Sequence, residues 1–132
     1  MADKVESIKN IAESTLSNPE LLSKIANALK EGTRRSRQHA AQVLSAVAAL
    51  DAQKVAPYGE ILVDSLSRPE AQTRWECLDA LTKLVDVDLD LCARAIDGAE
   101  TALFDEESGP LHLAAMRFLC KFGASSEENS EK

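Results

Sequence analysis

A cluster of basic residues, Lys30, Arg34, Arg35 and Arg37, has the clearest chemical potential in this sequence. It places four of the fifteen Lys and Arg residues within eight consecutive positions. Three of the four fall in the first turn of a helix that we expect to begin after Thr33, where the helix dipole disfavours each cation by roughly 0.3–1 kcal/mol. A local conflict of this kind often marks a functional position. The cluster therefore predicts a site for an anion or an acidic partner.

The same cluster also has a structural interpretation. Arg37 would then bridge to an acid in the following part of the chain, and Arg34 and Arg35 would be solvated. In the functional interpretation, Arg74 extends the stripe of positive charge, and Trp75 beside it either packs between helices or anchors a partner, as Trp and Arg often do at binding hot spots. Both interpretations stay open at this point. The candidate partner-binding residues are Arg34, Arg35, Arg37, Arg74, Trp75, Arg117 and Lys121.

Residues suited to catalysis or metal binding are few. His39 and His112 are the only histidines, they lie 73 positions apart, and neither has a Cys or Asp three or four residues later. The acidic run Asp86, Asp88 and Asp90 lacks the glycine and the distal glutamate of a calcium loop, and Asp88 suits a helix cap instead. We therefore expect no catalytic residue, no metal site and no cofactor, and we expect that the protein is not an enzyme.

An internal repeat indicates the elements that must position the basic residues. Five residues recur 37 positions later, and the pairs are Leu29 and Leu66, Arg37 and Arg74, Ala40 and Cys77, Leu44 and Leu81, and Val47 and Leu84. A period of roughly 20–50 residues is typical of stacked units, none of which buries its apolar face alone. Aromatic residues make up only 4% of the chain, so small aliphatic side chains must form the core. The small residues around Gly98 predict a close helix crossing.

The spacing of start and stop signals divides the chain into helical hairpins. After a first helix near the N-terminus, we expect antiparallel hairpins over residues 18–49, 51–86 and 88–123. The expected fold is all-α: a right-handed α-α superhelix, or short solenoid, of about three such hairpins plus the N-terminal helix. It forms a single domain over residues 1–123, and residues 124–132 are expected to form a disordered acidic tail because they have no apolar anchor.

Individual residues predict where the helices begin and end. Pro57 predicts a kink or a break near residue 56. Ser67 and Glu70 have the spacing of a capping box at the start of a helix. Gly32 is expected to end its helix in the left-handed conformation, and Gly123 is expected to close the last helix. The expected N-caps are Asn18, Thr33, Asp51, Asp88 and Ser108.

Two segments resemble the HEAT family of helical repeats. Arg37, Ala40 and Leu44 in the first unit, and the equivalent residues of the second, match the second helix of that repeat, and Pro57 lies where the family often has a kinking proline. The resemblance covers residues 18–123. It implies a non-catalytic array that holds proteins, or in a few related proteins DNA, and a ladder of arginines linking neighbouring units. The third unit has His112 at the position of the arginine, so the ladder is expected to weaken at that end.

Charge and cysteine content narrow the expected partners and compartment. Residues 1–50 carry a net charge of +2 and residues 51–132 a net charge of −9, which gives −7 for the chain. An acidic protein is not built for counterion-driven binding to nucleic acid. The three cysteines, Cys77, Cys92 and Cys120, contain no CxxC pair, and each is expected in the core of a protein from a reducing compartment. With no signal peptide and no apolar run long enough to span a membrane, the chain is expected to be cytoplasmic.

These observations predict a non-catalytic scaffold that binds a protein or peptide with acidic groups through its second helices. The alternative is a module that binds nucleic acid through the same basic stripe, for which steep salt dependence would be diagnostic. Self-association, for instance as a homodimer, is a third possibility, because the last unit of a stack leaves an apolar face uncovered.

Overall fold

The computed structural model describes the backbone of residues 2–105 and 108–130, and the side chains of residues 8–105 and 108–125. Every regular element in these ranges is a helix, so the predicted all-α class is confirmed. The elements are α1 (Ala2–Leu16), α2 (Pro19–Glu31), α3 (Arg34–Leu50), α4 (Ala52–Val55), the 3-10 turn η1 (Ala56–Tyr58), α5 (Gly59–Asp64), the 3-10 turn η2 (Ser65–Ser67), α6 (Ala71–Leu84), α7 (Leu89–Ala93), α8 (Ile96–Leu103) and α9 (Gly109–Ser130).

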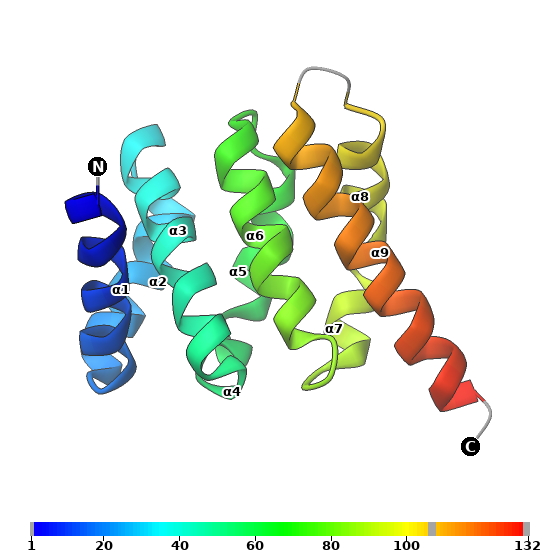
Figure 1. The fold of residues 1–132 in the computed structure, drawn as a ribbon, viewed down its shortest axis with the longest axis horizontal. Helices are drawn as coiled ribbons and strands as arrows, with labels where there is room; N and C mark the ends of the chain where they lie inside the picture. The colour runs from blue at the N-terminus through cyan, green and yellow to red at the C-terminus, as the bar shows by residue number, and fades with distance from the viewer. Residues whose placement is uncertain (1, 106–107, 131–132) are drawn as a thin grey trace.

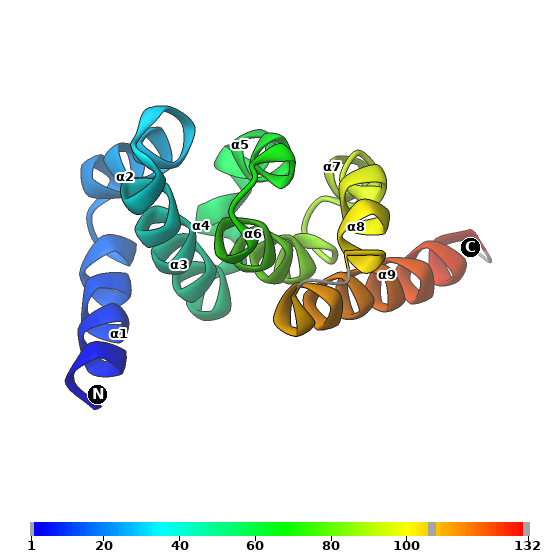
Figure 2. The ribbon, with the colours of Figure 1, turned by 90° about the horizontal axis from the view of Figure 1, so that it is seen from above.

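The helices form two layers. Helices α3, α6 and α9 pack side by side in chain order as one layer, and α2, α5, α7 and α8 lie behind them as the other (Figures 1 and 2). Helix α1 packs mainly against α3, at the end of the molecule opposite α9. Aliphatic residues and alanines from both layers form one buried core, with Phe118 as its largest fully buried side chain. The layering places the second helix of each predicted hairpin on a single face.

Side chains cap the N-termini of five helices at the expected residues. In each case a side-chain oxygen accepts a hydrogen bond from a backbone N–H two or three residues later. These N-cap residues are Asn18, Thr33, Asp51, Asp88 and Ser108. Local sequence therefore determines where these helices begin.

The first helix of the hairpin is broken in both the second and the third unit. The break that Pro57 predicted is confirmed, because the chain passes from α4 through the 3-10 turn η1 into α5. The third unit breaks at the equivalent place, between α7 and α8, although it has no proline there. Leu91 of α7 packs so closely on Gly59 of α5 that a Cβ atom at Gly59 would overlap its side chain. Packing against the preceding unit therefore accompanies the second break.

The expectations for two glycines have different outcomes. The close crossing expected at Gly98 is confirmed, since a Cβ atom there would lie 2.8 Å from the Cβ atom of Leu66. The left-handed cap expected at Gly32 is wrong, because its φ is −75° and ψ is 176°. A left-handed cap serves to satisfy the last carbonyls of a helix. Here the guanidinium of Arg37 donates to the carbonyl oxygen of Gly32 at 3.1 Å, and the N–H of Gly32 donates to Ala28.

The last helix is longer than the sequence indicates. Helix α9 continues through Gly123 to Ser130, so the helix end expected at Gly123 is wrong. The backbone of residues 124–130 is helical, residues 131 and 132 lie outside the described residues, and the disorder expected over residues 124–132 stays a prediction. Gly123 has no positive φ. It therefore acts as an interior helical glycine, and the residues after it include no proline that would end the helix.

The cysteines divide into two groups. Cys77 and Cys92 are fully buried, as expected, and burial raises the pKa of both thiols, to about 12 for Cys92. Cys120 is exposed on α9, so its expected place in the core is wrong. The helix turns this position away from the core, which the neighbouring Phe118 occupies.

Candidate functional site

Arg37 forms an ion pair with Glu70 in the next unit. Its Nη2 and Nε atoms donate to Oε1 of Glu70 at 2.6 and 2.9 Å, and the glutamate side chain is only 1% exposed. Burial by itself raises the pKa of Glu70, but the hydrogen bond from Arg37 and the charges of Arg37 and Arg34 outweigh it and hold the pKa below its usual value. The structural interpretation of Arg37 therefore applies.

Glu70 consequently does not serve in the expected capping box. Its backbone stands at the N-cap position of α6, but its side chain makes no capping hydrogen bond there. The hydroxyl of Ser67 instead donates to the carbonyl oxygen of Asp64 at 2.8 Å. The buried ion pair with Arg37 takes the carboxylate away from its own helix.

Arg74 repeats this arrangement one unit later. Its Nη1 atom lies 3.1 Å from Oδ2 of Asp105, a residue of the segment between α8 and α9, and the arginine side chain is 11% exposed. Arg74 thus links the second unit to the third as Arg37 links the first to the second. Both guanidinium groups are held inside the molecule by these ion pairs, and the expectation that Arg74 extends a basic stripe for a partner stays a prediction.

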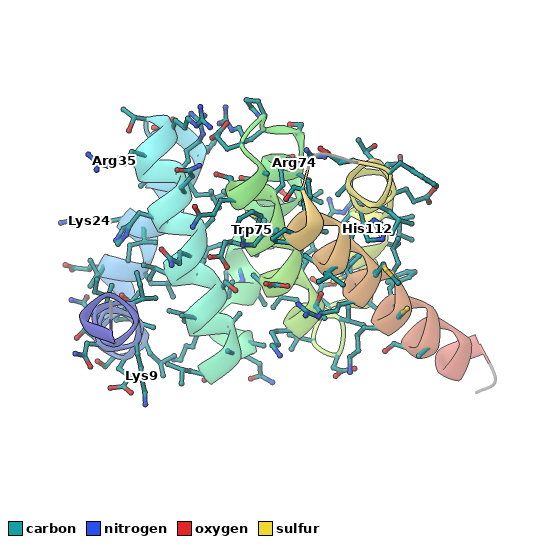
Figure 3. The ribbon with its side chains drawn as sticks, turned by 45° about the horizontal axis from the view of Figure 1, so that its top comes forward. Lys9, Lys24, Arg35, Arg74, Trp75 and His112 are labelled. Carbon is teal, nitrogen blue, oxygen red and sulfur yellow. The ribbon has the colours of Figure 1, made fainter. Side chains whose placement is uncertain are left out.

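The remaining cations of the basic cluster lie at the N-terminal end. Arg34 and Arg35 are exposed in the first turn of α3, as the sequence indicates. Arg35 points away from the body of the molecule (Figure 3). Arg35 belongs to α3, whereas the predicted contact residues Arg117 and Lys121 belong to α9, on the other side of α6 (Figure 1).

A shallow groove crosses the face of the second helices. It has a volume of about 370 Å³ and draws residues from three helices: Ser45 and Ala49 of α3, Asp79, Thr82 and Lys83 of α6, and Arg117 of α9. Burial raises the pKa of Asp79, and the positive charges of Arg117 and Lys83 lower it by a smaller amount. Two cations therefore lie close to one carboxyl group. Of the predicted residues, Arg117 belongs to this groove.

Glu76 lies one helical turn before Asp79, a residue of the groove, and the sequence did not identify it as a candidate. Burial, and secondarily the charge of Asp79, raise the pKa of Glu76 to about 7, against a hydrogen bond from Gln72 that lowers it. At neutral pH the carboxyl group of Glu76 therefore populates both its neutral and its ionised form. The only signal in the sequence is two acids three positions apart on a helix, where like charges repel.

Trp75 and Lys121, two further predicted contact residues, lie outside the lining of this groove. Trp75 is half-buried on α6 and packs against the core, with part of its ring left exposed beside α9 (Figure 3). Its packing against the core agrees with the first of the two roles that the sequence left open, and its role as an anchor for a partner stays a prediction. The Nζ atom of Lys121 lies 2.9 Å from Oδ2 of Asp86 in an exposed ion pair. Such pairs contribute little stability, so Lys121 is available to exchange partners.

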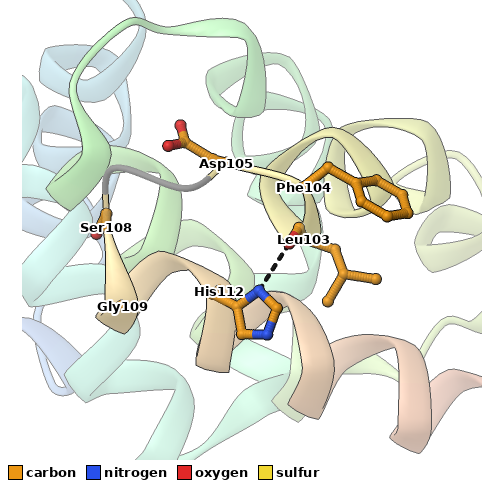
Figure 4. Close-up of a pocket in the computed structure, with 6 residues that line it drawn as sticks. All are labelled: Leu103, Phe104, Asp105, Ser108, Gly109 and His112. Atoms are coloured by element: carbon orange, nitrogen blue, oxygen red, sulfur yellow. Dashed lines mark hydrogen bonds between the residues drawn. The ribbon is translucent and has the colours of Figure 1, made fainter.

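His112 takes the place of arginine in the third unit. Its Nδ1 atom donates to the carbonyl oxygen of Leu103 at 2.6 Å (Figure 4). Arg37 makes the equivalent contact with Gly32, at the end of the first helix of its own hairpin. His112 is exposed, and no further unit packs beside it among the described residues. His39, expected at the surface, is exposed as well.

Within residues 8–105 and 108–125, no group of three or more His, Cys, Asp or Glu side chains is placed to hold a metal ion. None of the helices in the described ranges has both the length and the apolar character needed to cross a membrane. No protein-family model matches the chain, and a search of curated proteins finds no match either.

Proposed function

We propose that this protein is a non-catalytic HEAT-like scaffold that binds an acidic peptide segment of a partner protein across its second helices. Its hairpins would form a short right-handed superhelix. Two observations support the HEAT-like assignment: the pairs of Arg37 with Glu70 and of Arg74 with Asp105 link successive units at nearly the same spacing. The unpaired cysteines support a reducing compartment, such as the cytoplasm.

The groove between α3, α6 and α9 carries the functional part of the proposal. A peptide lying in it would meet residues from all three units at once. Arg117 and Lys83 together carry two positive charges against the single carboxylate of Asp79. Glu76 adds only a partial negative charge at neutral pH because its pKa is about 7. The groove is therefore suited to accept a carboxylate from the partner.

Trp75 supplies an apolar contact next to these charges. It lies one turn before Asp79 on α6 and so shares a helix face with this groove residue. Trp and Arg are the residues most enriched among binding hot spots. A ligand that combines an acidic residue with an apolar residue about one turn away would use both. We assign Arg117, Lys83 and Trp75 as the principal contacts.

The proposal is tested by selecting ligands for the immobilised protein from a displayed library of random peptides. Acidic peptides should be enriched, and a selected peptide should bind the Lys83→Glu/Arg117→Glu variant more than tenfold more weakly, a loss of about 1.4 kcal/mol. A matched control, Lys9→Glu/Lys54→Glu, makes the same change in net charge at exposed positions outside the groove. Enrichment of basic peptides, or equal losses in both variants, would contradict the proposal.

A further inference from the structure

The C-terminal end of the helix stack exposes an apolar hollow. Six residues of α8, α9 and the start of the intervening segment line this hollow of about 410 Å³: Leu103, Phe104, His112, Met116, Leu119 and Cys120. Phe104 is 77% exposed and Met116 is 43% exposed. Between the first and second units, and between the second and third, the equivalent faces are covered by the following hairpin. Among the described residues, no further hairpin covers this face of the third unit.

The opposite end carries a second hollow. It has a volume of about 390 Å³ and lies between α2 and α3, lined by Ile25, Ala28, Arg35, Ser36, His39 and Ala40. Helix α1 packs chiefly on α3 and contributes no residue to this lining. Lys24 lies one helical turn before Ala28, and both Lys24 and Arg35 project from this end of the molecule (Figure 3). The N-terminal end therefore offers an apolar hollow with a basic rim.

The first and third hairpins differ in the sign of their net charge. Residues 18–50, the first hairpin, contain five Lys and Arg against two acids, whereas residues 88–123, the third hairpin, contain three against seven. At the C-terminal end, Asp97 and Glu100 are exposed on α8, and Glu100 lies one turn before Phe104. The apolar hollow there thus has an acidic rim, complementary to the rim at the N-terminal end.

We infer that copies of this protein associate head to tail, the C-terminal end of one copy seating on the N-terminal end of the next. Phe104 enters the hollow between α2 and α3, while Lys24 and Arg35 face Asp97 and Glu100. A contact between two C-terminal ends would bring acids against acids, and a contact between two N-terminal ends would bring cations against cations. Like charges brought together across an interface are costly. Only the head-to-tail arrangement pairs opposite charges.

Such a contact is heterologous, because it joins two different surfaces. An assembly of two copies therefore still has one unoccupied N-terminal end and one unoccupied C-terminal end. Association then grows into an open chain or closes into a ring. The rims are exposed, and salt screens charges at the surface. The average mass should therefore rise above the 14.3 kDa of one chain as the protein is concentrated from roughly 10 μM to 1 mM, the range of weak contacts, and should fall again at high salt.

A mixing experiment by sedimentation equilibrium tests the arrangement. Arg35→Glu disables the N-terminal end and Phe104→Asp disables the C-terminal end, and both residues are exposed, so circular dichroism should show unchanged folding. Each variant alone should stay monomeric. An equal mixture should form a species of twice the monomer mass and nothing larger, because it contains one intact end of each kind.

Three outcomes overturn the inference. The first is a wild-type protein that stays monomeric over the whole concentration range. The second is an Arg35→Glu variant that still dimerises, which would indicate a contact between two C-terminal ends. The third is a mixture that stays monomeric.

Disulfide trapping gives an independent test. Cys120 lines the C-terminal hollow and is exposed, whereas the other two cysteines are buried. Ser36→Cys adds a thiol to the N-terminal hollow, at the opposite end of the same chain. Mild oxidation of this variant should produce a ladder of linked chains, and the added change Cys120→Ser should abolish the ladder. Dimers formed by the wild-type protein through Cys120 alone would overturn the inference. The groove between the second helices takes no part in this contact, so its test is separate.

Discussion

Arg37 and Glu70 lie 33 positions apart, and one carboxylate oxygen of the glutamate accepts hydrogen bonds from two nitrogen atoms of the arginine, at 2.6 and 2.9 Å. The same guanidinium group also donates to the carbonyl oxygen of Gly32. One side chain thus closes the end of α2 and links two units. The arginine of the basic cluster that belongs to the internal repeat thus stabilises the stack, as its structural interpretation predicted.

Removing Arg37 should therefore lower stability strongly. Arg37→Ala leaves the Glu70 carboxylate buried without its cation, and breaking a buried pair on one side costs about 3 kcal/mol. Urea unfolding followed by circular dichroism measures the loss. The matched control Arg35→Ala removes an exposed arginine of the same first turn and should change stability by less than about 0.5 kcal/mol.

A double-mutant cycle separates the pair from its surroundings. Arg37→Ala/Glu70→Ala should lose less stability than the sum of the two single changes, because the second change removes the charge that the first leaves unpaired. Additive losses would mean that the two side chains do not interact, and would contradict the ion pair.

Acid should destabilise the protein through Glu70. The pKa of this carboxyl group is lowered in the fold, so the unfolded chain takes up protons first. The stability that Glu70 contributes is fully present above its unfolded value of 4.5 and is lost as the pH falls below it. Unfolding curves between about pH 5 and pH 3 should show this loss in the wild type and a smaller one in Glu70→Gln.

Glu76 should change the stability of the protein with pH in the opposite direction from Glu70, and in a higher pH range. Its pKa rises from 4.5 to about 7 in the fold, so the folded protein holds the proton longer than the unfolded chain does. Its contribution to stability is fully present below pH 4.5 and is lost as the pH rises through 7. Glu76→Gln should reduce the slope of stability between these values and should be more stable than the wild type at alkaline pH, by roughly 1 kcal/mol after allowance for solvent screening. The exposed Glu13→Gln serves as control, and an equal effect there would refute the assignment.

Two glycines should respond in opposite ways to alanine. Gly98→Ala places a Cβ atom 2.8 Å from that of Leu66, and such overpacking costs about 1–3 kcal/mol. Gly123→Ala meets no atom within 4 Å and replaces an interior helical glycine, so it should add roughly 0.5–1 kcal/mol. Thermal melts compare the two variants. A Gly123→Ala variant with no gain in helix content or stability would contradict the continuation of α9 beyond this residue.

The basic cluster should matter less for peptide binding than the groove. With an acidic peptide selected as above, Arg34→Glu/Arg35→Glu should reduce affinity less than tenfold, because these residues lie at the N-terminal end and outside the groove. A larger loss would place the binding site at the cluster. The same protein should give no gel shift with nucleic acid at low salt, and a shift that disappears steeply with salt would favour that alternative.

Local features of the fold were predictable from the sequence because they depend on neighbouring residues. Asn18 and Asp88 cap helices through hydrogen bonds that span three positions. Pro57 removes a backbone donor wherever it stands, so the break beside it could be read from one residue. The repeat of Arg37 at Arg74 indicated stacked units, and the apolar positions around both identified the buried faces.

The tertiary structure alone decided the partners and the environment of the charged residues. Glu70 could cap its own helix or pair with Arg37, and only the packing of α6 against α3 brings the arginine within 2.6 Å. The raised pKa of Glu76 depends on desolvation by helices distant in sequence, for which the local sequence carries no signal. The exposure of Phe104 likewise depends on what stacks beside it. The sequence by itself determined where most helices begin and most of their buried positions, although not the end of α9 or the exposure of Cys120. Burial and long-range contacts decided which charges are held inside and which remain exposed.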